Sequence, residues 1–211
     1  MNIKELKERL ASRTPEILGS EAFAKFSLLL PLVQKEDGLH VLFEVRALSM
    51  RRQPGEICFP GGKIDESDHS PENAAVRETQ EELGVPIENI EILFPLDFML
   101  SPFGMIIYSY AGLLDLTDLR LNEAEVGEVF TVPLDFLLQT KPDLHYIQLR
   151  PEPEENFPYH LITHGKEYNW QAKKMEEYFY VYENRIIWGL TAKVLKHFLD
   201  ILRSAPQVLD K

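Results

Sequence analysis

Cysteine is almost absent from this chain of 211 residues, since Cys58 is the single one. No disulfide can form within the chain, and a reducing compartment is the natural expectation, so we predict a cytoplasmic protein. Long apolar runs are absent as well, and nothing in the sequence has the form of a secretory signal. We therefore expect neither a membrane-spanning segment nor a disulfide-stabilised extracellular fold.

Basic residues are in short supply relative to acidic ones. The chain carries 22 Lys and Arg against 34 Asp and Glu, which gives a formal net charge of −12 at pH 7. This sign argues against a general nucleic-acid binder and against a protein of anionic membrane surfaces. An anionic small-molecule substrate would need cations or a local basic patch to offset the charge.

Apolar residues are plentiful enough for a core, at 45% of the chain. The length suits one domain, so we predict a single domain over residues 1–211, with its core at about 25–200 and short helical additions at both ends. Apolar periodicity predicts two end helices, at 2–10 and 191–202, and a short helix at 134–138. It also predicts strands at 26–33, 39–45, 90–98, 105–113, 126–132 and 178–187, the first two joined as a hairpin by an Asp-Gly turn, and an exposed loop at 150–155.

The stretch 70–86 predicts a further short helix with clear end signals. Ser70 is a good N-cap, and Pro71 occupies the first helical position, where proline is tolerated. Gly84 suits the left-handed residue that closes a helix, and Pro86 prevents its continuation.

Three carboxylates share one side of this helix. At 100° per residue, Glu78, Glu81 and Glu82 fall within one arc of about 100°, while a neighbouring apolar arc can face a core. Like charges at these spacings, near the negative end of the helix dipole, destabilise the helix by a few tenths of a kcal/mol each. A divalent cation would reverse that sign, because Mg²⁺ and Mn²⁺ take carboxylate oxygens and keep positions open for phosphates. A solvated acidic face is the alternative interpretation.

The glycine turn and the acidic helix together resemble a known signature. Gly61-Gly62, an acid, and then Arg-Glu-x-x-Glu-Glu-x-Gly-Val over residues 77–85 are similar to the motif of the Nudix hydrolases. The interval from the glycines to the arginine is one residue longer than usual. Asp68 or His69 stands where a glutamate is expected, and Thr79 where an aliphatic residue is common. The resemblance implies an α/β (α+β) fold, a Nudix-type α/β/α sandwich with a mixed β-sheet and a loop–helix–loop catalytic motif.

Three arginines precede the glycine turn. Arg46, Arg51 and Arg52 lie within one stretch of seven residues, and guanidinium groups bind phosphate oxygens bidentately. A basic surface turn is the alternative. The pattern Arg-x4-Arg-x3-Gly-Glu-x2-Phe-Pro-Gly-Gly, the longer motif and Ile-Trp-Gly-Leu-Thr-Ala at 187–192 resemble the coenzyme A pyrophosphatase branch of the family, although Ala47 stands where that branch carries serine.

This resemblance implies metal-dependent hydrolysis of the diphosphate bond of coenzyme A or acyl-CoA, which gives 3′,5′-ADP and (acyl-)4′-phosphopantetheine. The cofactor would be Mg²⁺ or Mn²⁺ and the partner a nucleotide substrate, with no nucleic acid and no membrane. One alternative is a hydrolase of ADP-ribose, NADH or another nucleoside diphosphate derivative. Another is a non-catalytic nucleotide-sensing domain. Nudix enzymes are commonly dimers, so a homodimer is a further expectation.

The resemblance implies a role for each residue of the metal site. Glu78 and Glu82, one turn apart, are the expected main metal ligands, and Glu81 is a further ligand or partner of the base. Gly62 has no side chain, so its backbone can approach the metal closely. Arg77 lies off the carboxylate arc and is expected to orient a glutamate through a salt bridge.

Roles for substrate and base are assigned from the flanking segments. Lys63, with the three arginines at 46, 51 and 52, is expected to bind the phosphates. A general base must reach the attacking water, and the acidic loop at 122–128 offers Glu123, Glu125 and Glu128, of which we favour Glu125. A solvated acidic loop is the alternative for each of them.

Overall fold

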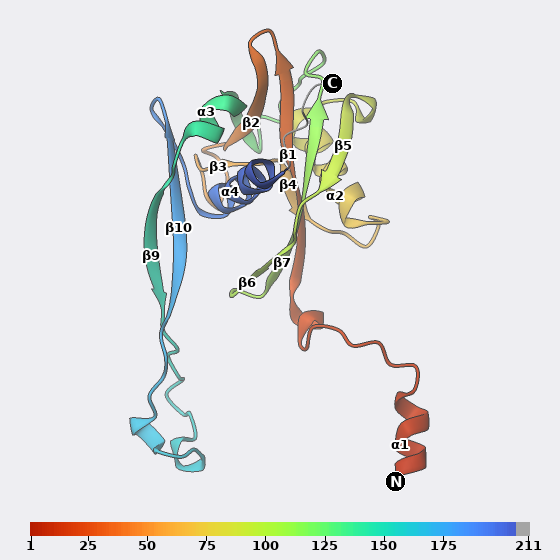
Figure 1. Ribbon diagram of the computed structural model, residues 1–211, viewed down its shortest axis with the longest axis vertical. Helices are drawn as coiled ribbons and strands as arrows, with labels where there is room; N and C mark the ends of the chain where they lie inside the picture. The colour runs from red at the N-terminus through yellow and green to blue at the C-terminus, as the bar shows by residue number, and fades with distance from the viewer. Residues whose placement is uncertain (206–211) are drawn as a thin grey trace.

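The computed structural model of the protein describes residues 1–205. A mixed sheet of eight strands forms its centre (Figure 1). Its strands are β1 (Ala24–Lys35), β2 (Gly38–Arg46), β3 (Ile57–Cys58), β4 (Gly61–Lys63), β5 (Ile90–Pro95), β6 (Met99–Ser101), β7 (Met105–Leu114) and β8 (Val126–Pro133). Neighbours run β3–β2–β1–β7–β5, with β4 beside β1, β6 beside β7 and β8 beside β2. β1 and β7 run parallel to each other, and the other paired strands of this sheet are antiparallel. The mixed sheet is confirmed.

The predicted hairpin opens this sheet and then splits. Lys35 pairs with Gly38 across the Glu36-Asp37 turn, and the two strands stay paired only as far as Leu32 and Val41. Beyond that point β3 pairs with β2 and β4 pairs with β1. The segment that carries the two glycines therefore fills the gap between the diverging halves of the hairpin.

Two helical layers cover the sheet. Alternate residues of β1 face opposite sides, as the period of a strand requires: Leu28 and Leu30 join a core cluster with helix α4 (Gly189–Ser204), whereas Leu29 joins a second cluster with helix α2 (Pro71–Leu83). The short helix α3 (Leu134–Gln139) lies on the α4 side, where Leu137 is fully buried. The predicted α/β/α sandwich is confirmed, as are the helices expected at 71–83, 134–138 and 191–202.

The strand predicted at 90–98 is wrong at its end. β5 stops at Pro95, after a register shift between Ile92 and Phe94, and a separate short strand, β6, pairs with the beginning of β7. A 3₁₀ turn at Ile87–Asn89 leads into β5. Pro95 stands at the break, where a proline cannot donate a hydrogen bond to the neighbouring strand, and Asp97 follows it.

The strand predicted at 178–187 is wrong in its bounds, because the segment holds the end of one strand, a turn and a second strand, both in a second sheet. β9 (Asp143–Leu149), β10 (Lys173–Tyr182) and β11 (Arg185–Ile187) form that sheet, and a turn at Glu183, with φ of +53°, separates β10 from β11. β9 and β10 extend from the body as a two-stranded arm (Figure 1), which ends in a segment with 3₁₀ turns at Tyr159–Leu161 and Gly165–Glu167. The predicted exposed loop at 150–155 lies at the far end of this arm.

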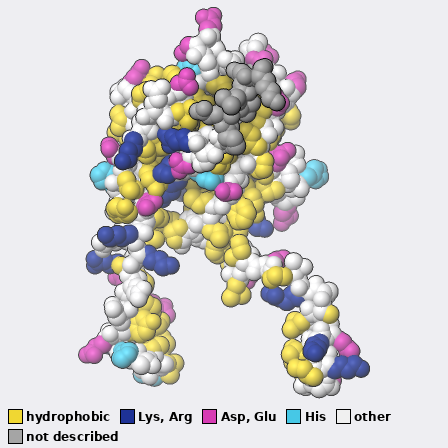
Figure 2. All heavy atoms as spheres, in the orientation of Figure 1, with side chains coloured by type: hydrophobic (Ala, Val, Ile, Leu, Met, Phe, Trp, Pro, Cys, Tyr) yellow, Lys and Arg dark blue, Asp and Glu magenta, His cyan; other side chains and the backbone are white. Residues whose placement is uncertain are grey.

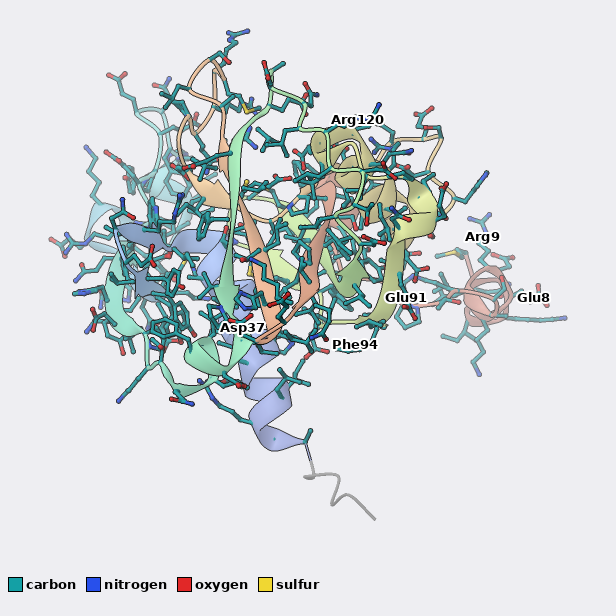
Figure 3. The ribbon with its side chains drawn as sticks, turned by 90° about the horizontal axis from the view of Figure 1, so that it is seen from above. Glu8, Arg9, Asp37, Glu91, Phe94 and Arg120 are labelled. Atoms are coloured by element: carbon teal, nitrogen blue, oxygen red, sulfur yellow. The ribbon has the colours of Figure 1, made fainter. Side chains whose placement is uncertain are left out.

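The N-terminal helix α1 (Ile3–Leu10) is confirmed. Asn2 caps it and forms a capping box with Glu5, yet none of its residues is buried. A 3₁₀ turn at Ser20–Ala22 precedes β1. Figure 2 shows α1 and the β9–β10 arm as two separate projections from the body, and Figure 3, in which Glu8 and Arg9 are labelled, shows α1 standing apart from the sheet.

No helix within residues 1–205 is both long and apolar enough to cross a membrane. Residues 206–211 lie outside the described part of the chain. The single domain over 1–211 therefore stays a prediction.

Candidate active site

The glycine turn is held against β1 by contacts that leave no room for a side chain. A Cβ on Gly61 would lie 2.5 Å from the carbonyl oxygen of Ser27, and one on Gly62 would lie 2.3 Å from Cδ of Glu78. Gly61 and Gly62 pair with Leu28 and Ser27 in the sheet. The two glycines thus allow the turn to lie between strand β1 on one side and helix α2 on the other.

Helix α2 begins and ends where the sequence predicts. Oγ of Ser70 accepts a hydrogen bond from the amide of Asn73 at 3.1 Å, and Ser27 Oγ donates one of 2.6 Å to the carbonyl of Pro71, which ties the start of the helix to β1. Gly84 closes the helix with φ of +64°, and a Cβ there would lie 2.1 Å from the carbonyl oxygen of Arg120. Arg120 is labelled beside the helix in Figure 3.

Two of the three predicted carboxylates meet the glycine turn. Glu82 is buried, with 5% of its surface exposed, and its Oε2 accepts a 2.8 Å hydrogen bond from the amide of Gly61. The Glu78 carboxyl lies against Gly62, and its Oε1 is 2.9 Å from Nη1 of Arg77. The side chain of Glu81 is 54% exposed and contacts Arg77 at 3.1 Å. The helix therefore turns Glu78 and Glu82 inward and leaves Glu81 at the surface.

Asp68, and not His69, takes the place of the expected upstream glutamate. Its two carboxylate oxygens accept hydrogen bonds of 2.9 and 3.0 Å from Nε and Nη2 of Arg77, and Nη2 also donates to the carbonyl of Lys63 at 3.2 Å. The Arg77 guanidinium thereby holds the pKa of Asp68 below its usual value of 3.8. The longer loop is closed by this bidentate pair, which also places Arg77 beside Glu78.

The inward carboxylates repel one another in a desolvated site. Burial, helped by the charges of Glu78 and Glu125, raises the pKa of Glu82 to about 8. Burial also raises the pKa of Glu78, against the opposing effect of Arg77. Hard carboxylate oxygens brought together in this way suit a divalent cation, which would offset the repulsion.

The side chains are not preassembled around such a cation. Among residues 1–205, no three His, Cys, Asp or Glu side chains are already arranged as a metal cage. Glu78 is engaged by Arg77 and Glu82 by the amide of Gly61. The donor set fits a divalent ion in chemistry, and ligation would require these carboxylates to exchange their present partners.

Of the three acids in the 122–128 loop, the structure brings Glu125 towards this cluster. The amide of Ala47 donates to the carbonyl of Glu125 at 2.8 Å, and the amide of Asn122 donates to the carbonyl of Glu82 at 2.9 Å, so the loop is tied to the end of α2. The charge of Glu125 reaches both Glu78 and Glu82. Glu128 instead forms a salt bridge of 2.8 Å with Arg185, and Glu123 is exposed.

Of the four basic residues predicted to bind phosphate, one lies near the carboxylate cluster and three lie at the surface. Arg46 is partly buried on β2, and its charge acts on Glu82. Its Nε donates to the carbonyl of Arg52 at 3.4 Å, which folds the arginine loop back on itself. Arg51, Arg52 and Lys63 have exposed side chains.

Sequence reasoning missed one acid of the cluster, Glu44. It lies on β2 with 1% of its surface exposed, and the Cys58 thiol donates to its Oε2 at 3.9 Å. Burial, and then the charge of Glu82, holds the pKa of Glu44 well above its usual value, and burial raises the pKa of Cys58 to about 12. The signal was a lone acid inside the apolar run Val-Leu-Phe-Glu-Val.

Comparison with known proteins identifies the family of the chain. A family model described as the NUDIX domain matches residues 30–153, more than half of the chain. The chain belongs to the Nudix family, whose members act on nucleoside diphosphate derivatives and generally use divalent metal ions. The predicted membership of the Nudix hydrolases is therefore confirmed.

Individual relatives carry more specific names. The mouse peroxisomal coenzyme A diphosphatase NUDT7 is 36% identical over 141 residues, which cover 66% of this chain and 59% of the mouse protein. The chain thus spans less than two thirds of that relative. Nudix hydrolase 3 of Caenorhabditis elegans is 31% identical over 209 residues, covering 95% of this chain and 82% of the worm protein. The predicted resemblance to the coenzyme A pyrophosphatase branch is confirmed as a likeness.

Solved structures of Nudix proteins also align with the chain. The NUDIX domain of Shewanella oneidensis NrtR, complexed with ADP ribose, aligns with a TM-score of 0.45 and 25% identity over 67% of this chain and 89% of that one. A MutT/nudix family protein from Enterococcus faecalis aligns with a TM-score of 0.47 and 19% identity over 99% of this chain and 74% of that one.

Proposed function

We propose that this protein hydrolyses the diphosphate bond of coenzyme A or acyl-CoA, to give 3′,5′-ADP and (acyl-)4′-phosphopantetheine, with Mg²⁺ or Mn²⁺ as cofactor. The observation that carries the proposal is the pair of inward carboxylates, Glu78 and Glu82, against the Gly61-Gly62 turn, with Arg46 beside them. An acidic site next to a phosphate-binding group suits an anionic diphosphate that is met together with a cation.

Glu78 and Glu82 would hold the cation, with Glu81 as a further ligand and the backbone of Gly62 close by. A bound divalent ion lowers the pKa of water and neutralises charge on the diphosphate. Arg77 acts as a positioning residue, because it contacts Glu78 at 2.9 Å and is itself held by Asp68. Its guanidinium sets the direction of the Glu78 carboxylate.

Glu125 is the proposed general base, which accepts the proton of the attacking water on its carboxylate. The backbone contacts of its loop with Ala47 and with α2 keep it at the cluster while the side chain remains partly exposed. Arg46, Arg51, Arg52 and Lys63 are the proposed phosphate-binding residues. Three of these side chains are exposed and free to turn towards an incoming diphosphate.

An apolar groove lies on the α4 face of the sheet. The groove has a volume of about 540 Å³ and lies between the β6–β7 hairpin, β10 and α4, with Met105 and Ile107 among its lining residues. Phe26 pairs directly with Ile107 on one side and with Lys63 on the other, so these side chains share one face of the sheet. This is the α4 face, whereas Glu78 and Glu82 lie on the α2 side of the sheet, so the groove does not distinguish the pantetheine arm of coenzyme A from the second sugar of ADP-ribose.

A substrate panel tests the proposal. Purified protein with Mg²⁺ or Mn²⁺ is offered coenzyme A, an acyl-CoA, ADP-ribose and NADH, and the products are separated by chromatography. Release of 3′,5′-ADP from coenzyme A is the expected result. Cleavage of ADP-ribose or NADH with coenzyme A left intact would overturn the substrate assignment, and binding without cleavage of any of the four would favour a nucleotide-sensing domain.

Two further expectations stay predictions. The homodimer is one, and sedimentation or light scattering would measure it. The cytoplasmic location is the other: it was inferred from cysteine usage, whereas the mouse relative is named as a peroxisomal protein.

A further inference from the structure

Glu44 is a fully buried acid in the middle of strand β2. It lies directly opposite Cys58 of β3 on one side and Val129 of β8 on the other. Leu42, two residues earlier on the same face, packs in the core cluster that contains Ala75 and Leu83 of helix α2. The alternation of a strand therefore turns the Glu44 side chain towards the α2 face, where the candidate cation site lies.

The Glu44 carboxyl has little that would stabilise it there. Its only hydrogen-bond partner within residues 1–205 is the Cys58 thiol, a weak donor at 3.9 Å from Oε2. Oε1 is buried and has no partner in that range. Since an unpaired buried carboxyl destabilises a folded protein, and nearly all buried polar groups find partners, the second oxygen indicates a missing ligand.

The surroundings of Glu44 point to the same site. Cys58, its cross-strand neighbour, is three residues before Gly61, whose amide holds Glu82 at 2.8 Å. Arg46 follows Glu44 by two residues on β2 and faces the same side of the sheet. The charged groups that act on Glu44 are Glu82, Arg46 and Glu125. Arg46 and Glu125 also act on Glu82. Glu44 thus lies on the sheet side of the carboxylate cluster.

We propose that Glu44 is a further carboxylate of the divalent-cation site, contributed by the sheet beneath the cluster and not by the family motif on helix α2. It would supply an oxygen ligand from the sheet, whereas Glu78 and Glu82 belong to α2. A hard divalent ion takes six or more oxygen ligands, so a carboxylate from β2 would add to those of α2. This inference rests on the cation site of the proposed function.

Direct binding of Mn²⁺ alone tests the role of Glu44. Free Mn²⁺ is measured by electron paramagnetic resonance during titration of the wild-type protein and of Glu44→Gln, which keeps the volume of the side chain and removes its charge. We expect the Mn²⁺ dissociation constant to rise about tenfold or more, or one bound ion to be lost. A dissociation constant and stoichiometry within twofold of wild type would overturn the proposal.

Glu177→Gln is the matched control. Glu177 is also a buried acid, 5% exposed, with one partnered oxygen and one without a partner in residues 1–205, but it lies on β10 of the second sheet and pairs with Lys193 of α4. Mn²⁺ binding in this variant should equal that of wild type. An equal loss in both variants would assign the effect to buried charge in general and would overturn the specific role of Glu44.

Glu82→Gln separates failure of the inference from failure of the site. If Glu82→Gln weakens Mn²⁺ binding and Glu44→Gln does not, only the role of Glu44 is refuted. If neither weakens it, the cation site itself is refuted and the inference falls with it. Thermal unfolding without metal verifies that Glu44→Gln is folded; should it unfold, Glu44→Asp is titrated instead, with weaker Mn²⁺ binding expected and wild-type binding again overturning the proposal.

Discussion

Gly62→Ala is the substitution for which the structure gives the sharpest expectation. The added Cβ would lie 2.3 Å from Cδ of Glu78 and 2.4 and 2.5 Å from its two carboxylate oxygens, whereas ordinary contacts begin near 3.4 Å. The Glu78 carboxyl must therefore move by about 1 Å. Gly62 has no positive φ, so alanine adds no backbone strain and the change acts through Glu78 alone.

The magnitude follows from how steeply reactions depend on placement. A displacement of about 1 Å in a positioned group can lower a rate about 100-fold, which corresponds to about 2.7 kcal/mol of transition-state stabilisation. We expect kcat/KM for coenzyme A in Mn²⁺ to fall by about this factor, with Mn²⁺ affinity reduced as well. The assay measures 3′,5′-ADP release, together with thermal unfolding to verify the fold.

Gly127→Ala is the control, because a Cβ there would meet its nearest atoms at 3.5 to 3.7 Å, an ordinary contact, in the same region of the sheet. Its activity should stay close to wild type. If Gly62→Ala retains both its activity and its Mn²⁺ affinity within threefold, Glu78 is not a ligand whose position matters, and the metal assignment on α2 is refuted.

Three further perturbations test the site and its supports. Asp68→Asn removes the negative charge of Asp68 and one of the two oxygens that accept hydrogen bonds from Arg77. The free energy of unfolding should fall by about 1–3 kcal/mol at pH 7, measured by urea titration. Because folding lowers the pKa of Asp68 from its ordinary value of 3.8, this stabilisation is fully present above pH 3.8 and is lost as the pH falls through the lowered pKa, where the two proteins should converge. Equal stability at pH 7 would contradict the pairing. Glu82→Gln should reduce turnover about 100-fold or more while the fold is retained, since the amide oxygen can still accept from the backbone, and wild-type turnover would remove the metal assignment. Mn²⁺ at about 100 times its dissociation constant should raise the free energy of unfolding by about 2.7 kcal/mol, and Glu78→Gln should lose most of that gain in a thermal-shift measurement.

Features that depend on neighbouring residues were predictable from the sequence. The ends of α2 follow from a serine cap and a left-handed glycine, and both are present as expected. The β1–β2 hairpin follows from a short polar turn between two apolar runs, although Glu36 and Asp37 form the turn and Gly38 already belongs to β2. The shared side of Glu78 and Glu82 follows from the pitch of a helix.

Features that depend on segments distant in the chain were not predictable in the same way. The charged first half of β10 does not have the pattern of a strand, and it forms one by pairing with β9. The register shift of β5 against β7, between Ile92 and Phe94, is likewise not visible in the sequence. The acidic loop offered three candidate bases, of which we favoured Glu125, and only the fold shows that Glu128 instead pairs with Arg185, 57 residues away.

The sequence by itself determined the class of chemistry, because the acids, the arginines and the glycines lie close together along the chain and their spacing acts through local geometry. Only the tertiary structure decided which groups face the cluster. The split between β1 and β2 admits the glycine turn, and the same split places Glu44 beneath it. Strand pairing and burial are properties of contacts between distant segments, so no pattern within one segment could assign them.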